Sequence, residues 1–278
     1  MKKGFTLIEL LVVIVIIGIL ATISVATFNE YVERARIAKA IAFASSSERK
    51  MTISMIEDET TPLGIWDFEE GVGTTVADLS GRGHTLINSG GTTLPGDWDT
   101  DTPLTNSTAS VRLTGATAAQ LTSNLVTEIP ISEFTVSLWF KRMAAAGGYE
   151  YLTLHSSGYG PPGYGIRFYP GDRMYFYSDV DQIYTPTGTV LQGKWQHVLA
   201  TYKAGETNVY IDGSLEVTGN FTTNPPDGWR HWIFGSTISK VFMLAPATSS
   251  VKTTSRVIVQ PESLSVIVTT VNPAVNPV

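Results

Sequence analysis

The chain has 278 residues, which is enough for one large domain or two ordinary ones. Its net charge is −6, from 25 acidic and 19 basic residues, and no basic stripe follows the sequence, so we expect no nucleic acid partner. The sequence contains no cysteine. This excludes disulfide bonds, thiolate chemistry and structural zinc sites that use cysteine.

The first apolar segment covers residues 5–28 and contains one charged residue, Glu9. As a helix, a segment of this length reaches about 36 Å, which is enough to span a bilayer. Lys2 and Lys3 precede it, and by the positive-inside tendency they keep the N-terminus in the cytoplasm. The sequence therefore predicts a single membrane span with an N-in, C-out orientation.

Two other interpretations of the apolar segment explain it less well. A secretory signal peptide has an apolar region of about 7 to 15 residues and ends in a small-residue cleavage site, whereas this segment is longer and lacks such a site. A plain membrane anchor leaves the carboxylate of Glu9 unexplained, because inserting it costs on the order of 2.5 kcal/mol. We therefore expect an opposite charge to compensate Glu9.

The N-terminal residues carry a family resemblance. Residues 2–10, Lys-Lys-Gly-Phe-Thr-Leu-Ile-Glu-Leu, and the Val/Ile run that follows resemble the class III signal of type IV pilins and type II secretion pseudopilins. The resemblance implies that a prepilin peptidase cuts between Gly4 and Phe5 and that Phe5 is then N-methylated. It also implies that Glu9 pairs with the terminal amine of a neighbouring subunit, which would make a buried carboxylate tolerable.

Beyond residue 28 the pattern predicts that the helix continues with an amphipathic character. Glu30 and Arg34 form a favourable i,i+4 pair, and the basic residues Arg34, Arg36 and Lys39 are interpreted as a solvated face, with lipid headgroup binding as the alternative. The helix either frays across residues 44–47 or runs on to about Glu57. Apolar residues at spacings of three and four give this helix its apolar face: Phe28, Tyr31, Ala35, Ala38 and Ala42.

From residue 64 onward the sequence changes to a period of two. Residues 134–141 alternate between apolar and polar side chains, which is typical of a half-buried strand. Asp212 and Gly213 separate two further strand-like runs and suit a type I′ hairpin turn, in which both residues have positive φ. A succession of short strands without helices between them predicts a sandwich or jelly roll. Other strand candidates are Ile65 to Phe68, Ser110 to Leu113, Tyr151 to His155, Gly165 to Tyr169, Arg173 to Tyr177 and Trp195 to Tyr202.

Three segments of this region resemble the laminin-G-like group of concanavalin A-type jelly rolls. They are Trp-Asp-Phe-Glu-Glu-Gly with Val-Ala-Asp-Leu-Ser-Gly-Arg-Gly-His in residues 66–84, Phe-Thr-Val-Ser-Leu-Trp-Phe in residues 134–140, and Trp-Gln-His-Val with Val-Tyr-Ile-Asp-Gly in residues 195–213. The resemblance implies two antiparallel sheets and a binding or structural role. The expected fold is a long, membrane-spanning, pilin-like N-terminal α-helix followed by an all-β sandwich.

We divide the chain into a leader of residues 1–4, an assembly helix of residues 5–60, a sandwich of residues 61–238 and a tail of residues 239–278. The last core strand that the resemblance leads us to expect is missing from the sequence. The tail is rich in Thr, Ser, Val and Pro, with strand-like runs at residues 255–259 and 263–271. It either supplies substitute strands or is disordered or read from an altered frame.

The sequence offers weak candidates for catalysis. The Glu-x-Asp-x-x-Glu arrangement of jelly-roll glycosidases does not occur, and Asp67, Glu69 and Glu70 are interpreted as turn and edge carboxylates. The four histidines lack zinc-ligand spacing, and His197 is interpreted as a packing residue. We therefore predict that the protein is not an enzyme.

Two ligand hypotheses remain for the sandwich. Calcium is the one cofactor with a candidate residue, Asp78, because carboxylate and turn carbonyl oxygens are typical calcium ligands. The alternative is that Asp78 forms a structural Asx turn. Aromatic residues in Gly-rich loops could stack on sugar rings or cap the core, and the candidates for sugar binding are Tyr149, Tyr159 and Tyr164.

The sequence thus favours a major or minor type IV pilus subunit, made as an inner-membrane precursor and displayed outside the cell. Its expected partners are the prepilin peptidase, other pilin subunits and a glycan or extracellular protein. Two alternatives are a type II secretion pseudopilin, working in a pseudopilus, and a membrane-tethered, lectin-like adhesin.

Overall fold

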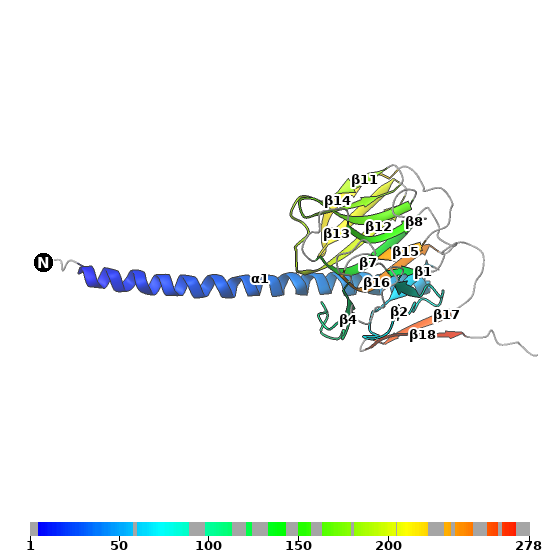
Figure 1. The fold of residues 1–278 in the computed structure, drawn as a ribbon, viewed down its shortest axis with the longest axis horizontal. Coiled ribbons are helices and arrows are strands. Elements are labelled where there is room, and N and C mark those ends of the chain that lie inside the picture. Colours follow the sequence, from blue (N-terminus) through cyan, green and yellow to red (C-terminus); the bar gives the residue numbers. More distant parts are fainter. Residues whose placement is uncertain are drawn as a thin grey trace, which may run out of the picture.

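The computed structural model describes residues 5–57, 60–88, 98–112, 121–123, 133–142, 150–156, 163–178, 181–203, 205–221, 231–234, 237–246, 255–260 and 263–270. One long helix projects from a β-sandwich, as Figure 1 shows. Over these ranges the sandwich consists of two eight-stranded sheets, and a separate two-stranded sheet follows it in the chain. This architecture confirms the predicted order of a long helix followed by an all-β sandwich.

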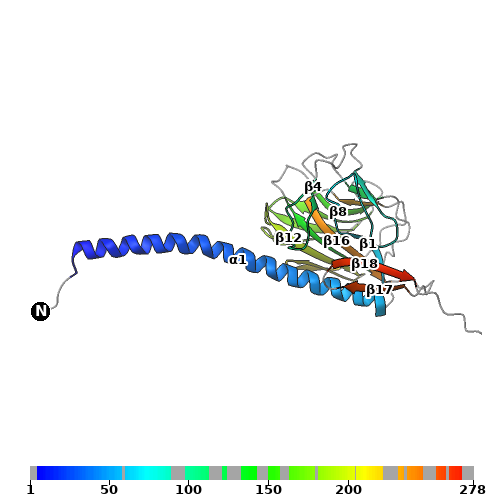
Figure 2. The same ribbon diagram turned by 90° about the horizontal axis from the view of Figure 1, so that it is seen from below.

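Helix α1 (Leu7–Glu57) is 51 residues long, so it runs on to Glu57 rather than ending at residues 44–47. Its C-terminal part lies against the sandwich, and its N-terminal part extends away from it (Figure 2). Within the described part of the chain, no helix contains an apolar stretch long enough to cross a membrane.

The face of α1 that packs on the sandwich differs from the apolar face of the sequence pattern. Ala40, Ala44 and Met51 are buried, and Ile37 and Ile41 pack beside them. The small alanines let the helix approach the sheet closely. The residues of that pattern are exposed instead, because apolar residues occur on more than one side of this helix and the sandwich selects among them: Phe28, Tyr31, Ala35, Ala38 and Ala42.

The first sheet has the strand order β14-β13-β12-β7-β16-β5-β4, and β1 also pairs with β16. Every pairing in it is antiparallel. In this order its strands are β14 (Ser214–Gly219), β13 (Glu206–Ile211), β12 (Trp195–Lys203), β7 (Glu133–Lys141), β16 (Thr237–Pro246), β5 (Ser110–Val111), β4 (Trp98–Asp99) and β1 (Thr60–Trp66).

The second sheet has the strand order β11-β10-β9-β8-β15-β6-β3-β2, again with antiparallel pairs. In this order its strands are β11 (Gln182–Tyr184), β10 (Arg173–Tyr177), β9 (Gly163–Tyr169), β8 (Glu150–Ser156), β15 (His231–Phe234), β6 (Leu121–Ser123), β3 (Leu86–Asn88) and β2 (Thr75–Val76). The two-stranded sheet pairs β17 (Ser255–Gln260) with β18 (Ser263–Thr270).

The core lies between the two large sheets. Alternate residues of β7, β9, β10, β12 and β13 point into it, as the period of two predicted. Phe134 on β7 stacks on Tyr202 of β12, and Phe140 contacts Phe168 of β9 across the sandwich. This apolar layer holds the two sheets together through the hydrophobic effect.

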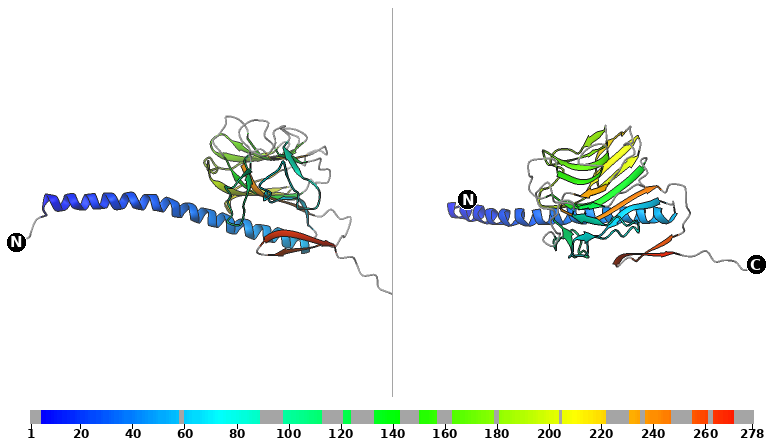
Figure 3. Two further views of the ribbon diagram at one scale, coloured as in Figure 1. Left: turned by 60° about the horizontal axis from the view of Figure 1, so that its bottom comes forward. Right: turned by 45° about the vertical axis from the view of Figure 1, so that its right-hand side comes forward.

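The tail boundary predicted at residue 238 is wrong, because it falls inside β16. This strand pairs with β7 on one side and with β1 and β5 on the other. Residues 237–246 therefore close the first sheet, although they lack the sequence that the laminin-G resemblance leads us to expect. The hairpin of β17 and β18 lies outside both large sheets, beside the C-terminal part of α1 (Figure 3).

Candidate functional sites

The first candidate site is the N-terminal end of α1. The backbone N–H and the hydroxyl of Thr6 both donate to Glu9 Oε2, at 2.8 and 2.7 Å, and Glu9 N–H lies 3.4 Å from Thr6 Oγ1. This is a capping box, which satisfies backbone donors in the first turn of a helix. The signal was present in the sequence as Thr-x-x-Glu before an apolar run, and our sequence analysis missed it.

The predicted processing site lies next to this cap. Phe5 is described and is 79% exposed, whereas Gly4 lies outside the described residues. The capping box uses only Thr6 and Glu9, so a cut between Gly4 and Phe5 would leave all of its atoms in the mature chain. From Leu7 to Leu20 the described apolar side chains of α1 are exposed, and an exposed apolar surface of this extent indicates an interaction surface.

The second candidate site is the junction between α1 and the sandwich. Arg36 forms ion pairs with Glu33, at 2.8 Å, and with Asp212 in the turn between β13 and β14. Its Nη2 also donates to the backbone oxygen of Trp195 at 2.8 Å. A hydrogen bond from Arg36 lowers the pKa of Glu33. Burial opposes the charge of Arg36, but its bonds to Glu33 and Asp212 outweigh burial and raise its pKa.

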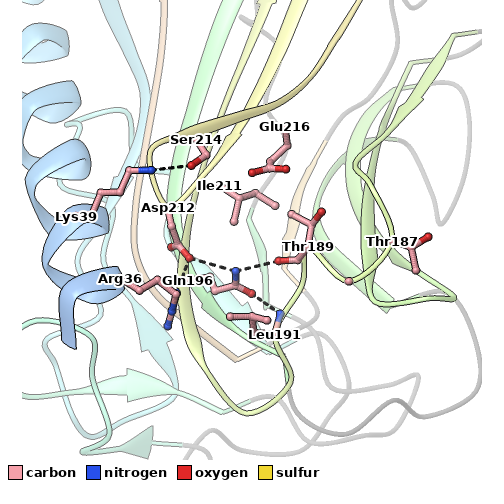
Figure 4. A pocket seen from close by; sticks show the side chains of 11 residues that line it. Arg36, Lys39, Thr187, Thr189, Leu191, Gln196, Ile211, Asp212, Ser214 and Glu216 are labelled. Carbon is pink, nitrogen blue, oxygen red and sulfur yellow. Dashed lines mark hydrogen bonds and ion pairs between the residues drawn. The ribbon is translucent and has the colours of Figure 1, made fainter. Parts of the chain in front are cut away.

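Asp212 connects this junction to the strands. Its Oδ1 accepts from His197 N–H at 2.9 Å, and its Oδ2 accepts from Gln196 Nε2 at 3.2 Å as well as from Arg36. Gln196 continues the network by accepting from Leu191 N–H at 2.6 Å (Figure 4). One carboxylate therefore holds two strands and the helix together.

An open pocket of about 320 Å³ lies beside this network, lined by α1, the β13–β14 hairpin and residues 187–191. Lys39 reaches across it and donates to Ser214 Oγ at 2.7 Å. The interpretation of Arg34, Arg36 and Lys39 as one solvated face holds for Arg34 and Lys39, which are exposed, but is wrong for Arg36, whose side chain is 17% exposed and paired in the junction. Arg34 pairs with Glu30 at 2.5 Å.

Apolar contacts complete the junction. Ala40 and Ala44 pack against Trp139 and Trp195 on the outer face of the first sheet. Gly213 has a φ of 74° and follows Asp212 with a φ of 49°, as the type I′ turn predicts. A Cβ atom on Gly213 would lie 2.8 Å from Phe43 Cβ, so the turn needs glycine both for its backbone angle and for the approach of the helix.

His197 is fully buried at this junction. Its Nε2 lies 2.8 Å from Ser137 Oγ, and its ring contacts Phe43 and Trp139, with centroid distances of 6.0 and 5.2 Å. These contacts support its interpretation as a packing residue.

Asp78, the calcium candidate, organises a loop in this structure. Its Oδ1 accepts from Ile65 N–H at 3.1 Å and Ser80 N–H at 2.9 Å, and its Oδ2 accepts from Ser80 Oγ at 2.8 Å and His84 N–H at 2.9 Å. The bonds to Ser80 are those of an Asx turn. Among the described residues no group of three or more His, Cys, Asp or Glu side chains is placed to hold a metal ion. Calcium binding at Asp78 stays a prediction.

The loop carboxylates have structural partners too. Glu69 Oε2 accepts from Thr108 N–H and from its hydroxyl, both at 2.8 Å. Glu70 Oε1 accepts from Ala77 N–H at 2.7 Å, and burial raises the pKa of Glu70.

The three tyrosines proposed for sugar stacking do not form a described site. Tyr149 and Tyr159 lie outside the described residues. Tyr164 lies in β9 rather than in a loop, is 2% exposed, and packs on Phe134 and Tyr202 with centroid distances of 4.9 and 4.5 Å. The expectation that Tyr164 lies on a loop is therefore wrong. Its ring lies in the core and is not accessible to a sugar.

Comparisons with known proteins agree with this division of the chain. Residues 1–25 match the prokaryotic N-terminal methylation motif, and residues 113–242 match a laminin G family model of the concanavalin A-like lectin/glucanases superfamily. The second match extends into β16, in keeping with the corrected end of the sandwich. A crystal structure of a mutant of HCR/D has the same fold, with a TM-score of 0.51 and 16% identity over 68% of this chain and 50% of that one.

Curated relatives of the chain include pilus proteins. Fimbrial protein Q of Moraxella bovis is 33% identical over 94 residues, covering 32% of this chain and 60% of that protein. The type IV major pilin protein PilE1 of Neisseria gonorrhoeae is 34% identical over 84 residues, covering 30% of this chain and 37% of that protein. The matches thus span between about a third and three fifths of these relatives. The chain is a type IV pilin-like protein that joins an N-terminal methylation motif to a concanavalin A-like domain.

Proposed function

We propose that this chain is a subunit of a type IV pilus, in which α1 assembles with its neighbours and the sandwich is displayed on the outside. The observation that carries the proposal is the division of α1 into two parts. Its first part begins with the Thr6–Glu9 capping box and has exposed apolar side chains, whereas its second part is bound to the sandwich by Arg36 and by packed alanines. A filament or a membrane would cover the first part without disturbing the second.

The maturation steps follow from the N-terminal residues. Lys2 and Lys3 favour a precursor in the inner membrane with its N-terminus in the cytoplasm. The prepilin peptidase would cut between Gly4 and Phe5, freeing an amine that is then methylated. Glu9 Oε2 already accepts from Thr6, and Oε1 makes no hydrogen bond to any described residue, so this second oxygen would receive the amine of a neighbouring subunit.

The sandwich has a binding role in this proposal and not a catalytic one. It would carry adhesion to a glycan or an extracellular protein, because it is the part of the chain that the docked helix holds away from the assembly surface. The carboxylates Glu69, Glu70 and Asp78 support this role, since each is engaged by a backbone N–H, from Thr108, Ala77 and His84 respectively.

The test is to shear filaments from cells that produce an epitope-tagged chain and to sequence the chain found in them by mass spectrometry. We expect the sheared fraction to contain a chain that begins with methylated Phe5. A chain that is processed but found only in cell-associated pseudopili would favour the type II secretion system instead. A chain that remains in the membrane fraction under all conditions would favour a tethered adhesin. Either result would overturn the proposed pilus function.

A further inference from the structure

The outer face of the second sheet carries a cluster of tyrosine and arginine side chains on neighbouring strands. Ile166, Phe168, Met174 and Phe176 point into the core, so the residues between them lie on the opposite face. Tyr184 of β11 is the register partner of Tyr175 and joins the same face. We call this cluster the tyrosine–arginine patch, and it consists of Arg167, Tyr169, Arg173, Tyr175, Tyr177 and Tyr184.

Among the residues that the structure describes, Arg173 has no hydrogen-bond or ion-pair partner. Its Cζ lies 4.7 Å from the ring centroid of Tyr169 and 5.0 Å from that of Tyr184, so two aromatic rings hold the guanidinium. It forms no hydrogen bond or ion pair with any residue that the structure describes, and its buried Nε has no acceptor. Arg36 and Arg142, in contrast, are both paired with carboxylates.

The neighbouring carboxylate does not neutralise Arg173. Asp172 adopts a φ of 51° in the turn between β9 and β10, and its Oδ1 accepts from Arg142 Nη1 at 3.0 Å and from Gln192 Nε2 at 2.8 Å. These two bonds hold the side chain of Asp172 at the turn. The charge of Arg173 therefore keeps its ability to bind an anion.

The rest of the patch is a fixed support for Arg173. Arg167 donates to the hydroxyl oxygens of Tyr175, at 3.2 Å, and Tyr177, at 3.0 Å. A Cβ atom on Gly165 would lie 2.3 Å from the ring of Tyr177, so this ring lies directly on the glycine backbone. Tyr175 stacks on Tyr184 with a centroid distance of 5.3 Å. A ligand would therefore meet side chains that are already ordered, which lowers the entropic cost of binding.

The position of the patch suits a ligand outside the filament. Helix α1 packs on the outer face of the first sheet, through Trp139 of β7 and Trp195 of β12. The patch lies on the outer face of the other sheet, whose strand β11 is well away from the helix in Figure 1. With α1 at the centre of a filament, the patch would face outward.

We propose that the tyrosine–arginine patch binds an acidic glycan, with Arg173 receiving a sugar carboxylate. A guanidinium offers a planar fork of donors that matches a carboxylate. Tyrosine hydroxyls both donate and accept, as sugar hydroxyls do, and Tyr169 and Tyr184, which contact the guanidinium and each other, are partly exposed. Arg167 is bound to the hydroxyls of Tyr175 and Tyr177, so the patch presents a single guanidinium, that of Arg173, beside the hydroxyls of Tyr169 and Tyr184. This combination favours a glycan over an acidic peptide, which would call for several cations.

The proposal names a ligand class for the sandwich and rests on the proposed display of that domain, but its test does not use filaments. The purified full-length chain in detergent is titrated calorimetrically with hexagalacturonate, with its uncharged methyl ester and with a hexaglutamate peptide. We expect binding to hexagalacturonate only. Failure of filament incorporation would leave this result unaffected, so the two proposals can fail separately.

Variants locate the site. Arg173→Gln should weaken hexagalacturonate binding about ten-fold or more, the usual effect of losing a charge-assisted hydrogen bond. Arg173→Lys keeps the charge but loses the planar set of guanidinium donors, so its loss of affinity should be smaller. This variant also tests the site if Arg173→Gln does not fold. Arg112→Gln, with the same charge change on the other sheet, should bind as the wild type does. The proposal is overturned if the wild type does not bind, if the methyl ester or hexaglutamate binds as tightly, or if Arg173→Gln and Arg173→Lys both keep full affinity.

Discussion

Arg36 on the helix and Asp212 in the β13–β14 turn form an ion pair between side chains that are only 17% and 11% exposed. The two residues lie 176 positions apart in the sequence. Asp212 also accepts from His197 N–H, so one carboxylate fixes both the hairpin and the helix. The orientation of the sandwich on α1 therefore depends on this pair.

We predict that Arg36→Gln destabilises the docked structure by about 2 kcal/mol or more, because it leaves the half-buried carboxylates of Asp212 and Glu33 without their cation. The measurement is chemical unfolding of the full chain in detergent, followed by tryptophan fluorescence, since Trp139 and Trp195 lie under the helix.

The matched control for this prediction is Glu30→Gln. It removes the Arg34–Glu30 pair, whose side chains are exposed to solvent, and should change stability by less than about 0.5 kcal/mol. Equal effects of the two substitutions would show that the Arg36–Asp212 pair has no special role in docking.

The hairpin turn supplies a second prediction. Gly213→Ala should cost more than Gly193→Ala, because both glycines have positive φ, 74° and 68°, but only at Gly213 would the new methyl group meet Phe43. At Gly193 nothing lies within 4 Å of the added Cβ. The Gly193→Ala variant therefore measures only the cost of placing alanine at a positive φ, about 1 kcal/mol. Thermal unfolding of both variants gives the difference. If the two midpoints shift equally, the helix does not approach the turn as closely as described here.

The sequence predicted the parts of this fold that depend on local patterns. The helix, the period-two strands and the Asp212-Gly213 turn all follow from neighbouring residues, and the structure confirms them. The face of α1 that packs on the sandwich does not follow from the sequence, because Ala38 and Ala40 are alike in sequence and only the position of Trp139 and Trp195 on the sheet distinguishes them. Local patterns do not contain that information.

The sites show the same limit. The Arg36–Asp212 pair and the tyrosine–arginine patch join residues from different strands or from the helix, and no spacing in the sequence reveals them. Tyr164 was misplaced because the glycines beside it indicated a loop, whereas Gly165 is a strand residue that makes room for Tyr177. The Thr6–Glu9 capping box was different, since its pattern is local and could have been identified.

The pH dependence of docking gives a third prediction. The hydrogen bond from Arg36 lowers the pKa of Glu33 in the folded state below its usual value of 4.5. The stabilisation from Glu33 is therefore fully present above about pH 4.5 and is lost as the pH falls through the lowered value. Burial raises the pKa of Glu70, so that residue acts with the opposite sign, and wild-type data alone would mix the two.

Comparing the wild type with Glu33→Gln separates these effects. The difference in their thermal unfolding midpoints should be largest near pH 6 and should shrink as the pH falls below 4.5, because a protonated Glu33 resembles glutamine. A difference that stays constant from pH 6 to pH 3 would show that the charge of Glu33 does not contribute.

The last prediction separates the two roles that the structure and the proposed function give to Glu9. In the single chain its Oε2 completes the capping box with Thr6, and in a filament its charge would pair with the amine at Phe5 of a neighbour. Glutamine at the same position keeps a side-chain acceptor for the capping box but has no charge. Glu9→Gln should therefore keep the helix and its cleavage between Gly4 and Phe5.

Filament incorporation of Glu9→Gln should fall by about two orders of magnitude, because an unpaired buried ammonium costs roughly 3 to 5 kcal/mol. Glu9→Leu loses the charge and the cap together, so its incorporation should be no better than that of Glu9→Gln.

Thr6→Val loses the cap but keeps the charge of Glu9. We expect it to assemble nearly as the wild type does, after a loss of about 1 kcal/mol in helix stability. The measurement is the amount of each processed variant in sheared filaments, relative to the membrane fraction. Efficient assembly of Glu9→Gln with failure of Thr6→Val would show that Glu9 acts through the helix cap and not through its charge.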